Sequence, residues 1–333
     1  MQGEGWGGIT SRPERIEDEN AADLSVVLAT DDVETIDRGL ASLCAQTARR
    51  RIEVVLVSLS GETLHVDRGQ LDGFAGHRLV EPGVVVSLAA GRALGVRAAR
   101  APYIHIGETH AFPHPDWAER IIESVDERWT AIVSGLENAN ADGAISWANL
   151  LTDYGPWLSH LPGGEIASTP PYNTAFERSF ALQAVDVSED AFAAGYDLMA
   201  LVRHGRHRVL FQPAARVDHI NVSRVSHWLD QRYTGARARA GLRSRDWPWA
   251  RRFAYALAAP LIPLILAARL ARPLLAAERA WRLPRLTAPA MLVGLAASAC
   301  GELTAFISGE SPDVARRADE FELNKVRYSG IEP

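Results

Sequence analysis

Residues 103–117 read Y-I-H-I-G-E-T-H-A-F-P-H-P-D-W, and this stretch is the most informative of the chain. Its first residues form a short apolar run of the β type, which ends abruptly at Glu108-Thr109-His110. A turn with two prolines follows, and a helix begins near Asp116-Trp117. A carboxylate and an imidazole two residues apart can face one divalent cation, at the strand end where an open α/β sheet binds its ligands. The alternative is a polar strand end with a surface histidine.

The sequence on the N-terminal side of this stretch alternates between strands and helices. Continuous apolar runs, typical of strands buried on both faces, occur at 24–29 and 52–59, and a third strand is predicted at 79–86. Helices are predicted at 35–46 and 88–99. Strands alternating with helices imply βαβ units. We therefore predict an α/β fold with a mostly parallel central sheet and flanking helices.

The pattern is less regular beyond residue 117. The elements predicted there are a helix at 117–129, a strand at 131–135, irregular loops lining a binding face at 137–171, a helix at 191–204, edge strands at 208–211 and 215–218, and a helix with an arginine face at 225–241. Pro213 separates the two edge strands, because proline cannot donate to a sheet ladder.

Composition narrows the partners and the compartment. The net charge of −6 gives no reason to expect nucleic acid as a partner. The two cysteines, Cys44 and Cys300, form no metal or redox motif and fit a reducing compartment. Nearly all positive charge is arginine, since Lys325 is the only lysine. Residues 1–22 read as a polar lead-in without the features of a secretory signal. We therefore expect a cytoplasmic protein.

Two apolar stretches, 253–268 and 287–307, follow the predicted sheet region. Each is near or below the length of about 17–25 residues that a spanning helix needs. Arginines flank the first stretch on both sides and give no clear inside–outside orientation. Interfacial helices in a membrane surface fit this pattern, and a buried helical hairpin is the alternative. The resulting divisions are a flexible segment at 1–22, a catalytic domain at 23–245, apolar helices at 246–310 and a polar tail at 311–333.

Six short motifs in order resemble the family-2 glycosyltransferases, which are inverting, nucleotide-sugar-dependent enzymes with the A-type, Rossmann-like fold. The motifs are L-S-V-V-L-A-T, L-A-S-L-C-A-Q-T with I-E-V-V-L-V, G-R-A-L-G-V-R-A-A-R-A-P-Y-I, P-H-P-D-W, P-P-Y-N-T-A-F-E-R-S, and G-Y-D-L-M-A-L-V-R-H-G with F-Q-P-A-A-R-V-D-H. The resemblance covers residues 23–241. It implies transfer of a sugar from a nucleotide-diphosphate donor to a hydroxyl of a glycan or lipid-linked glycan, as in polysaccharide biosynthesis.

The resemblance also implies a divalent metal, Mn²⁺ or Mg²⁺, which stabilises the charge on the diphosphate leaving group. The family's Asp-x-Asp motif corresponds here to Glu108-Thr109-His110. His219, at the end of V-D-H, matches a late histidine that completes the metal site. The alternative for His219 is a strand-end histidine bonded to a backbone carbonyl. The metal ligands implied are therefore Glu108, His110 and His219.

The remaining site residues are carried over in the same way. Asp197 matches the base that takes the proton from the acceptor hydroxyl, with Glu189 and Asp190 as substitutes, and a solvated helix carboxylate as the alternative. The implied donor-binding residues are Thr30, Ser58, Arg92 and Glu108, of which Arg92 could instead be a surface residue. Those on the acceptor side are Asn173 and Arg178. The implied location is peripheral, on the inner face of the cytoplasmic membrane.

The chain departs from the family pattern in places that leave other functions open. Ser58 stands where the second strand normally ends in an aspartate, and His110 stands where the metal motif has a carboxylate. These changes favour a non-catalytic binding or scaffold protein with the same fold. A dehydrogenase or nucleotidyltransferase is disfavoured, because no G-x-G-x-x-G follows the first strand and no G-x-x-x-x-G-K-[ST] occurs.

Overall fold

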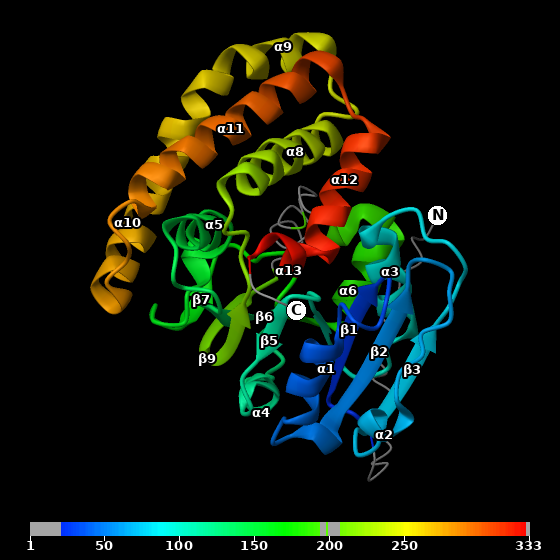
Figure 1. Ribbon diagram of the computed structural model, residues 1–333. Helices are drawn as coiled ribbons and strands as arrows, with labels where there is room; N and C mark the ends of the chain where they lie inside the picture. The colour runs from blue at the N-terminus through cyan, green and yellow to red at the C-terminus, as the bar shows by residue number, and fades with distance from the viewer. Residues whose placement is uncertain (1–20, 194–197, 199–206, 331–333) are drawn as a thin grey trace, which may run out of the picture.

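The computed structural model describes residues 21–193, Leu198 and residues 207–330. A central sheet with flanking helices forms one part of the molecule, and a layer of C-terminal helices lies over one end of this sheet (Figure 1). The predicted fold class, an α/β sheet with flanking helices and C-terminal apolar helices, is confirmed.

The N-terminal half of the sheet is parallel. Its strands, in the order β3-β2-β1-β4, are β1 (Leu24–Thr30), β2 (Ile52–Ser58), β3 (Gly76–Val80) and β4 (Tyr103–Ile106). The helices between them are α1 (Asp37–Cys44), α2 (Arg68–Leu71) and α3 (Leu88–Ala98), and η1 (Arg49–Arg51) is a 3₁₀ turn. A Cβ on Gly95 of α3 would lie 2.3 Å from Val27 Cγ1, so glycine lets α3 pack directly on β1. This close packing fixes α3 over the strand ends.

The second half of the sheet is mixed. The order continues β4-β8-β6-β9-β5, with β7 paired to β9, through β5 (Ala111–Pro113), β6 (Ala131–Asn138), β7 (Gly164–Ile166), β8 (Thr174–Glu177) and β9 (Val209–His219). β6 and β9 are parallel, whereas β8 runs antiparallel to both of its neighbours.

The prediction of two edge strands around Pro213 is wrong. β9 is one strand inside the sheet, paired with β5, β6 and β7. The register between β6 and β9 shifts between Ser134 and Gly135, and a Cβ on Gly135 would lie 2.5 Å from the Pro213 carbonyl oxygen. A bulge opposite a glycine therefore accommodates the proline without ending the strand.

Other differences from the predicted elements have local causes. The third strand ends at Val80, because Pro82 and Gly83, with φ +93°, break it. The first helix after the turn, α4 (Trp117–Glu123), ends well before Trp129. The region predicted as loops contains α5 (Ala144–Tyr154), η2 (Gly155–Trp157) and β7. The sequence did not predict α5, because the buried polar residues Ser146 and Asn149 interrupt the apolar periodicity of the helix. After β8 come α6 (Arg178–Val187) and η3 (Glu189–Phe192); most of the predicted helix at 191–204 lies outside the described residues.

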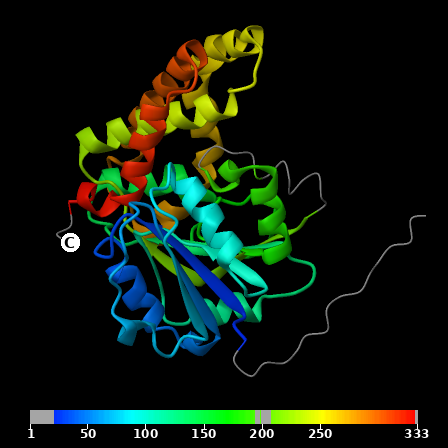
Figure 2. The same ribbon diagram turned by 90° about the vertical axis from the view of Figure 1, so that its right-hand side faces the viewer.

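The helical layer is built on α8 (Val225–Arg243). The remaining elements are α9 (Trp249–Ala258), η4 (Ala259–Leu261), α10 (Ile262–Trp281), α11 (Thr287–Ser308), α12 (Pro312–Leu323) and α13 (Lys325–Tyr328). α11 packs along α8, and α9 and α10 pack on the outer side of α11 (Figure 1). α12 then descends from this layer onto the strand ends (Figure 2). The polar tail is thus helical and returns to the sheet.

Candidate functional site: a buried carboxylate–histidine cluster

Two side chains that follow β4, Glu108 and His110, meet the distant His219 where β9 ends. β5 pairs antiparallel with β9, and Ala111 lies opposite His219, so the register brings His110 beside His219. The Nε2 atoms of these two histidines are 3.1 Å apart. Glu108 Oε1 lies 3.6 Å from His110 Nε2, and Glu108 Oε2 lies 3.5 Å from His219 Nε2. All three side chains are fully buried.

Hydrogen bonds at the Nδ1 atoms determine what the two Nε2 atoms present. The Asn221 side-chain amide donates to Asn138 Oδ1 and to the His219 carbonyl, so its oxygen is the atom 3.0 Å from His219 Nδ1 and accepts from it. Thr109 Oγ1 donates to the Leu323 carbonyl and lies 3.4 Å from His110 Nδ1, from which it can accept. His219 therefore carries its proton on Nδ1 and directs a lone pair from Nε2 into the cluster; His110 can donate either from Nδ1 to Thr109 or from Nε2 to His219, and the first arrangement leaves a second lone pair for a cation.

Burial keeps both imidazoles neutral. It lowers the pKa of His219 to about 3 and the pKa of His110 well below 6.5, and the charge of Lys325 lowers both further. Neutral imidazole is the form that binds a metal. Ligands at about 2.1 Å from one ion are about 3.0–3.4 Å apart. The separation of 3.1 Å lies within this spacing, and those of 3.5 and 3.6 Å exceed it by about 0.2 Å or less, so a small shift of Glu108 brings all three atoms to one ion. The residues therefore fit one divalent cation, with imidazole favouring Mn²⁺ over Mg²⁺.

The carboxylate of Glu108 is held by two side chains from other elements. The Tyr154 hydroxyl, at the end of α5, lies 2.8 Å from both carboxylate oxygens and donates to them. The Asn173 side-chain amide also donates to Glu108, from a backbone with φ +53°. Burial, followed by the charge of Glu108, raises the pKa of Tyr154 well above 10, so this hydroxyl stays protonated. Sequence reasoning assigned Asn173 to the acceptor side and missed Tyr154.

The C-terminal segment, residues 312–329, covers the cluster. The Leu323 carbonyl accepts from Thr109 at 2.8 Å, and Asp319 accepts from the Leu88 backbone N–H at 3.0 Å. Glu322 Oε1 lies 4.0 Å from His110 Nε2, and its Oε2 pairs with Lys325 Nζ at 3.1 Å. Burial raises the pKa of Glu322 to about 7, against the lowering effect of Lys325. Sequence reasoning missed this segment, although Lys325, the only lysine of the chain, could have pointed to it.

The predicted donor residues lie at the same strand ends and are all buried. Thr30 Oγ1 donates to the Asp32 carbonyl at 2.5 Å, and Ser58 Oγ donates to the Glu62 carbonyl at 2.8 Å. Arg92 is 4% exposed, with its guanidinium 4.4 Å from the Tyr172 ring centroid and 3.8 Å from Glu322 Oε1. The side chain of Arg92 is therefore not a surface residue, and it faces the cluster from α3.

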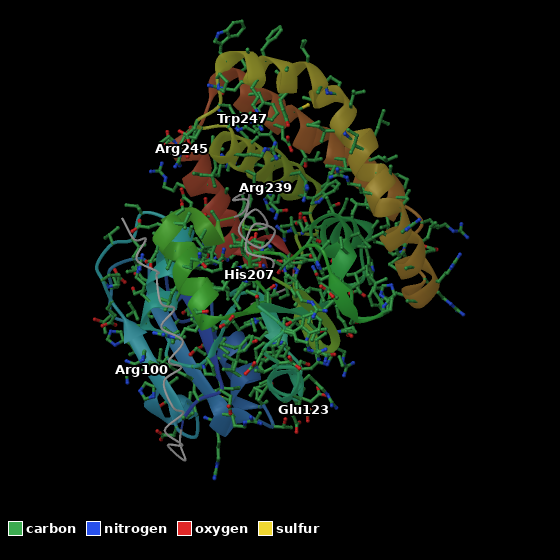
Figure 3. All side chains as sticks on the ribbon, turned by 180° about the vertical axis from the view of Figure 1, so that it is seen from behind. Arg100, Glu123, His207, Arg239, Arg245 and Trp247 are labelled. Atoms are coloured by element: carbon green, nitrogen blue, oxygen red, sulfur yellow. The ribbon has the colours of Figure 1, made fainter. Side chains whose placement is uncertain are left out.

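The other predicted residues are not brought into the cluster. Arg178 donates from Nε to the Ala99 carbonyl at 2.9 Å, next to Arg100, which lies at the end of the domain away from Arg239 (Figure 3). Asp197 lies outside the described residues. Of its substitutes, Asp190 is 3.4 Å from Arg245, on the wall of the neighbouring cavity. The roles assigned to these residues stay predictions.

A cavity of about 610 Å³ adjoins the cluster. Its inner wall is formed by Tyr154, Tyr172, Arg92, Glu322 and Lys325, and its outer wall by α8, α10 and α11. Figure 3 shows Arg239, one of the α8 residues, between the helical layer and the sheet. Cavities of roughly 300–1,000 Å³ bind small molecules, so this one is large enough for a sugar with part of an acceptor.

A second group of possible ligands lies nearby. His114, Glu137 and Asp218 have ligand atoms within 4.8 Å of one another, but all three side chains are partly exposed. Glu137 is already engaged by the Ser159 hydroxyl at 2.8 Å and by Arg216 at 3.8 Å. The buried Glu108–His110–His219 cluster is therefore the better candidate for a metal centre.

Comparison with solved structures identifies the type of fold. No protein-family model and no curated protein sequence matches the chain. The structure is similar to that of the mannosyltransferase PcManGT from Pyrobaculum calidifontis in complex with GDP-Man and Mn²⁺, with a TM-score of 0.51 and 16% identity over 85% of this chain and 87% of that chain. It is also similar to S. aureus TarS 1-349 in complex with UDP, with a TM-score of 0.44 and 14% identity over 86% of this chain and 90% of that one. The chain therefore shares the fold of PcManGT.

Proposed function

We propose that this protein is a glycosyltransferase of the inverting, family-2 type, which moves a sugar from a nucleotide-diphosphate donor to a hydroxyl acceptor. The observation that carries the proposal is the buried Glu108–His110–His219 cluster at the strand ends of a glycosyltransferase fold. PcManGT, the neighbour with the higher TM-score, was solved with a nucleotide sugar and Mn²⁺, which supports both the donor class and the metal.

The residues of the cluster have distinct tasks in this proposal. Glu108, His110 and His219 hold Mn²⁺ or Mg²⁺, which when bound offsets the negative charge that develops on the diphosphate leaving group. Asn221, Thr109 and Tyr154 orient these ligands through the hydrogen bonds described above. Because the ligands are fixed before the donor arrives, little reorganisation accompanies the charge development.

The donor, acceptor and base residues complete the proposal. Thr30, Ser58 and Arg92 bind the nucleotide, and because all three are buried and Arg92 pairs with Glu322 at 3.8 Å, donor entry requires the segments that cover them, residues 312–329 among them, to move. Asn173 and Arg178 act on the acceptor side, and Asp197 takes the proton from the acceptor hydroxyl. The cavity beside the cluster receives the transferred sugar and the acceptor, a glycan or a lipid-linked glycan.

The exposed apolar side chains of α9, η4 and α10 support the proposal that the protein binds to a membrane. Trp249–Trp281 and Thr287–Ser308 are long and apolar enough to cross a membrane, and they are 17% and 44% buried, respectively. α11 is bound to α8 along its length by Arg232 with Ser298 and by Arg243 with Glu302, which ties it to a charged helix. The large exposed apolar side chains of α9, η4 and α10 are Trp249, Phe253, Tyr255, Leu257, Leu261, Leu264, Ile265 and Leu275. We therefore propose interfacial rather than spanning helices, on the inner face of the cytoplasmic membrane.

The second candidate is a catalytically inactive protein with the same fold that binds or scaffolds. The observation that favours it is the complete burial of Thr30, Ser58 and His110, together with the two departures from the family pattern. In that case the cluster would hold residues 312–329 in place, and the protein would not bind a nucleotide-sugar donor.

Hydrolysis of a panel of UDP- and GDP-sugars, with and without Mn²⁺, separates the two candidates. An enzyme releases nucleotide diphosphate in a Mn²⁺-dependent manner, and Glu108→Ala abolishes the release. Glu123→Ala is the matched control, because Glu123 is exposed on α4 at the far end of the domain (Figure 3). No hydrolysis and no nucleotide binding by the wild-type protein would exclude the enzyme.

A further inference from the structure

Glu322 brings a second carboxylate to the cluster from the C-terminal segment. Its Oε2 pairs with Lys325 Nζ at 3.1 Å, whereas its Oε1 lies 4.0 Å from His110 Nε2 and 3.8 Å from Arg92 Nη2. Within the described part of the chain Oε1 is buried and has only these longer contacts, and the Glu322 carboxylate faces that of Glu108. A buried carboxylate oxygen with no closer contact is unfavourable, so it indicates a ligand that this oxygen is placed to meet.

The segment that carries Glu322 is fastened on both sides of it. Asp319, one turn earlier, accepts from the Leu88 N–H, and the Leu323 carbonyl accepts from Thr109. Asn324 donates to Asp31 at 3.5 Å. These contacts reach α3, the metal motif and the end of β1. The backbone at Glu322 is thus positioned by the same strand ends that position Glu108 and His110.

We propose that Glu322 is a fourth protein ligand of the cation site, so that cation binding and docking of residues 312–329 are coupled. The inference rests on the metal part of the proposed function. Two ligands of one ion lie about 3.0–3.4 Å apart, so Oε1 needs to approach His110 by less than about 1 Å. Lys325 then holds the other oxygen, in the way that ligating carboxylates are usually hydrogen-bonded.

The alternative role for Glu322 is to neutralise the buried cations Lys325 and Arg92, or to share a proton with Glu108, without binding a metal. Mn²⁺ titration of the full chain, by calorimetry and by the Mn²⁺ paramagnetic resonance signal, distinguishes the two. Glu322→Gln is expected to weaken Mn²⁺ binding by about tenfold or more. Glu320→Gln is the matched control, because this neighbouring carboxylate is exposed and accepts from Tyr328. An affinity of Glu322→Gln within twofold of wild type would overturn the proposal.

Glu322→Gln leaves Lys325 without its partner, so a second pair of variants removes this complication. In the Lys325→Met background, Glu322→Gln is still expected to lower Mn²⁺ affinity by about tenfold. If the double variant binds Mn²⁺ as tightly as Lys325→Met alone, the loss in the single variant came from the stranded ammonium, and the proposal is wrong. Thermal unfolding followed by circular dichroism checks that each variant is folded.

Hydrogen exchange of residues 312–329 tests the coupling directly. Mn²⁺ is expected to slow exchange in this segment in the wild type and in Glu320→Gln, but not in Glu322→Gln. Exchange that is unaffected by saturating Mn²⁺ in the wild type would contradict the coupling. Absence of Mn²⁺ binding by the wild type would overturn this inference together with the metal part of the proposed function. Tight Mn²⁺ binding that Glu322→Gln leaves unchanged would overturn this inference alone.

Discussion

The Nε2 atoms of His110 and His219 face each other at 3.1 Å inside a fully buried cluster. The His219 ring donates its Nδ1 proton to Asn221, so its Nε2 lone pair faces His110, and when His110 donates from Nδ1 to Thr109 two lone pairs meet with no proton between them. Two lone pairs at this separation repel unless a cation lies between them or one ring changes its tautomer.

Replacement of Asn221 should weaken metal binding without removing a ligand. Asn221→Leu removes the acceptor for His219 Nδ1–H and frees the ring to place its proton on Nε2, so we expect a loss of about 10–100-fold in Mn²⁺ affinity. Asn221→Asp keeps an acceptor oxygen and is expected to bind Mn²⁺ more tightly than Asn221→Leu. Calorimetric titration measures both. Equal affinities of the two variants would show that the tautomer of His219 is not set by this bond.

Acid should destabilise the protein through its buried neutral histidines. Burial lowers the pKa of His105 to about 3, against 6.5 in the unfolded chain, so the unfolded state binds the proton first and stability falls as pH drops from about 6.5 towards 3. Between pH 7 and pH 5 this one group costs about 2 kcal/mol. His105→Leu should reduce the loss in unfolding free energy over this interval by about that amount, as measured by urea unfolding at both pH values.

His105 is suited to this test because it packs edge-on against Trp117, at a centroid distance of 4.6 Å, and is not one of the three ligands. His65→Leu is the control, because His65 is exposed, and it should leave the pH dependence as in the wild type. A His105→Leu protein that loses as much stability as the wild type between pH 7 and pH 5 would contradict the assignment.

Close packing of α11 on α8 should make Gly301 intolerant of a side chain. A Cβ at this position would lie 2.2 Å from the Tyr233 carbonyl oxygen, and a backbone atom cannot move aside as a side chain does. We expect Gly301→Ala to lower the free energy of unfolding by about 1–3 kcal/mol. Gly143→Ala is the control, because nothing lies within 4 Å of a Cβ there. Urea unfolding that gives equal stabilities for the two variants would refute the close contact.

The apolar face of α9–α10 should govern binding to lipid. Leu257 and Leu264 are each 67% exposed, and we expect the double variant Leu257→Ser, Leu264→Ser to reduce partitioning into vesicles of phosphatidylglycerol and phosphatidylcholine by at least about tenfold. Val86→Ser with Val187→Ser is the control, because these exposed residues lie outside the helical layer. Co-sedimentation measures the partitioning. Equal binding of both double variants would argue for a different surface.

Much of the sheet could be predicted, because local patterns encode it. Residues 24–30 and 52–58 are mostly apolar on both faces of a strand, which favours burial of both faces in a sheet. The strands β1 and β2 occupy these residues. The second half was harder because its signals are mixed. A proline inside β9 indicated a strand break, but a glycine and a register shift in β6 absorb it. The sequence of residues 209–219 cannot indicate that the proline is accommodated, because the glycine and the register shift that accommodate it lie in β6.

Local sequence patterns were sufficient to predict the α/β class, the order of the main strands and helices in the first half, and the position of Glu108 and His110 at a strand end. Their proximity to His219 depends on the pairing of β5 with β9, which is a long-range register. The placement of Tyr154, Asn221 and Glu322 around the cluster likewise depends on how α5, the end of β9 and α12 pack. Hydrophobic periodicity reports the conformation of one element. The hydrogen-bond partners of a buried polar cluster come from several elements, so the composition of this site became visible only when those elements were packed together.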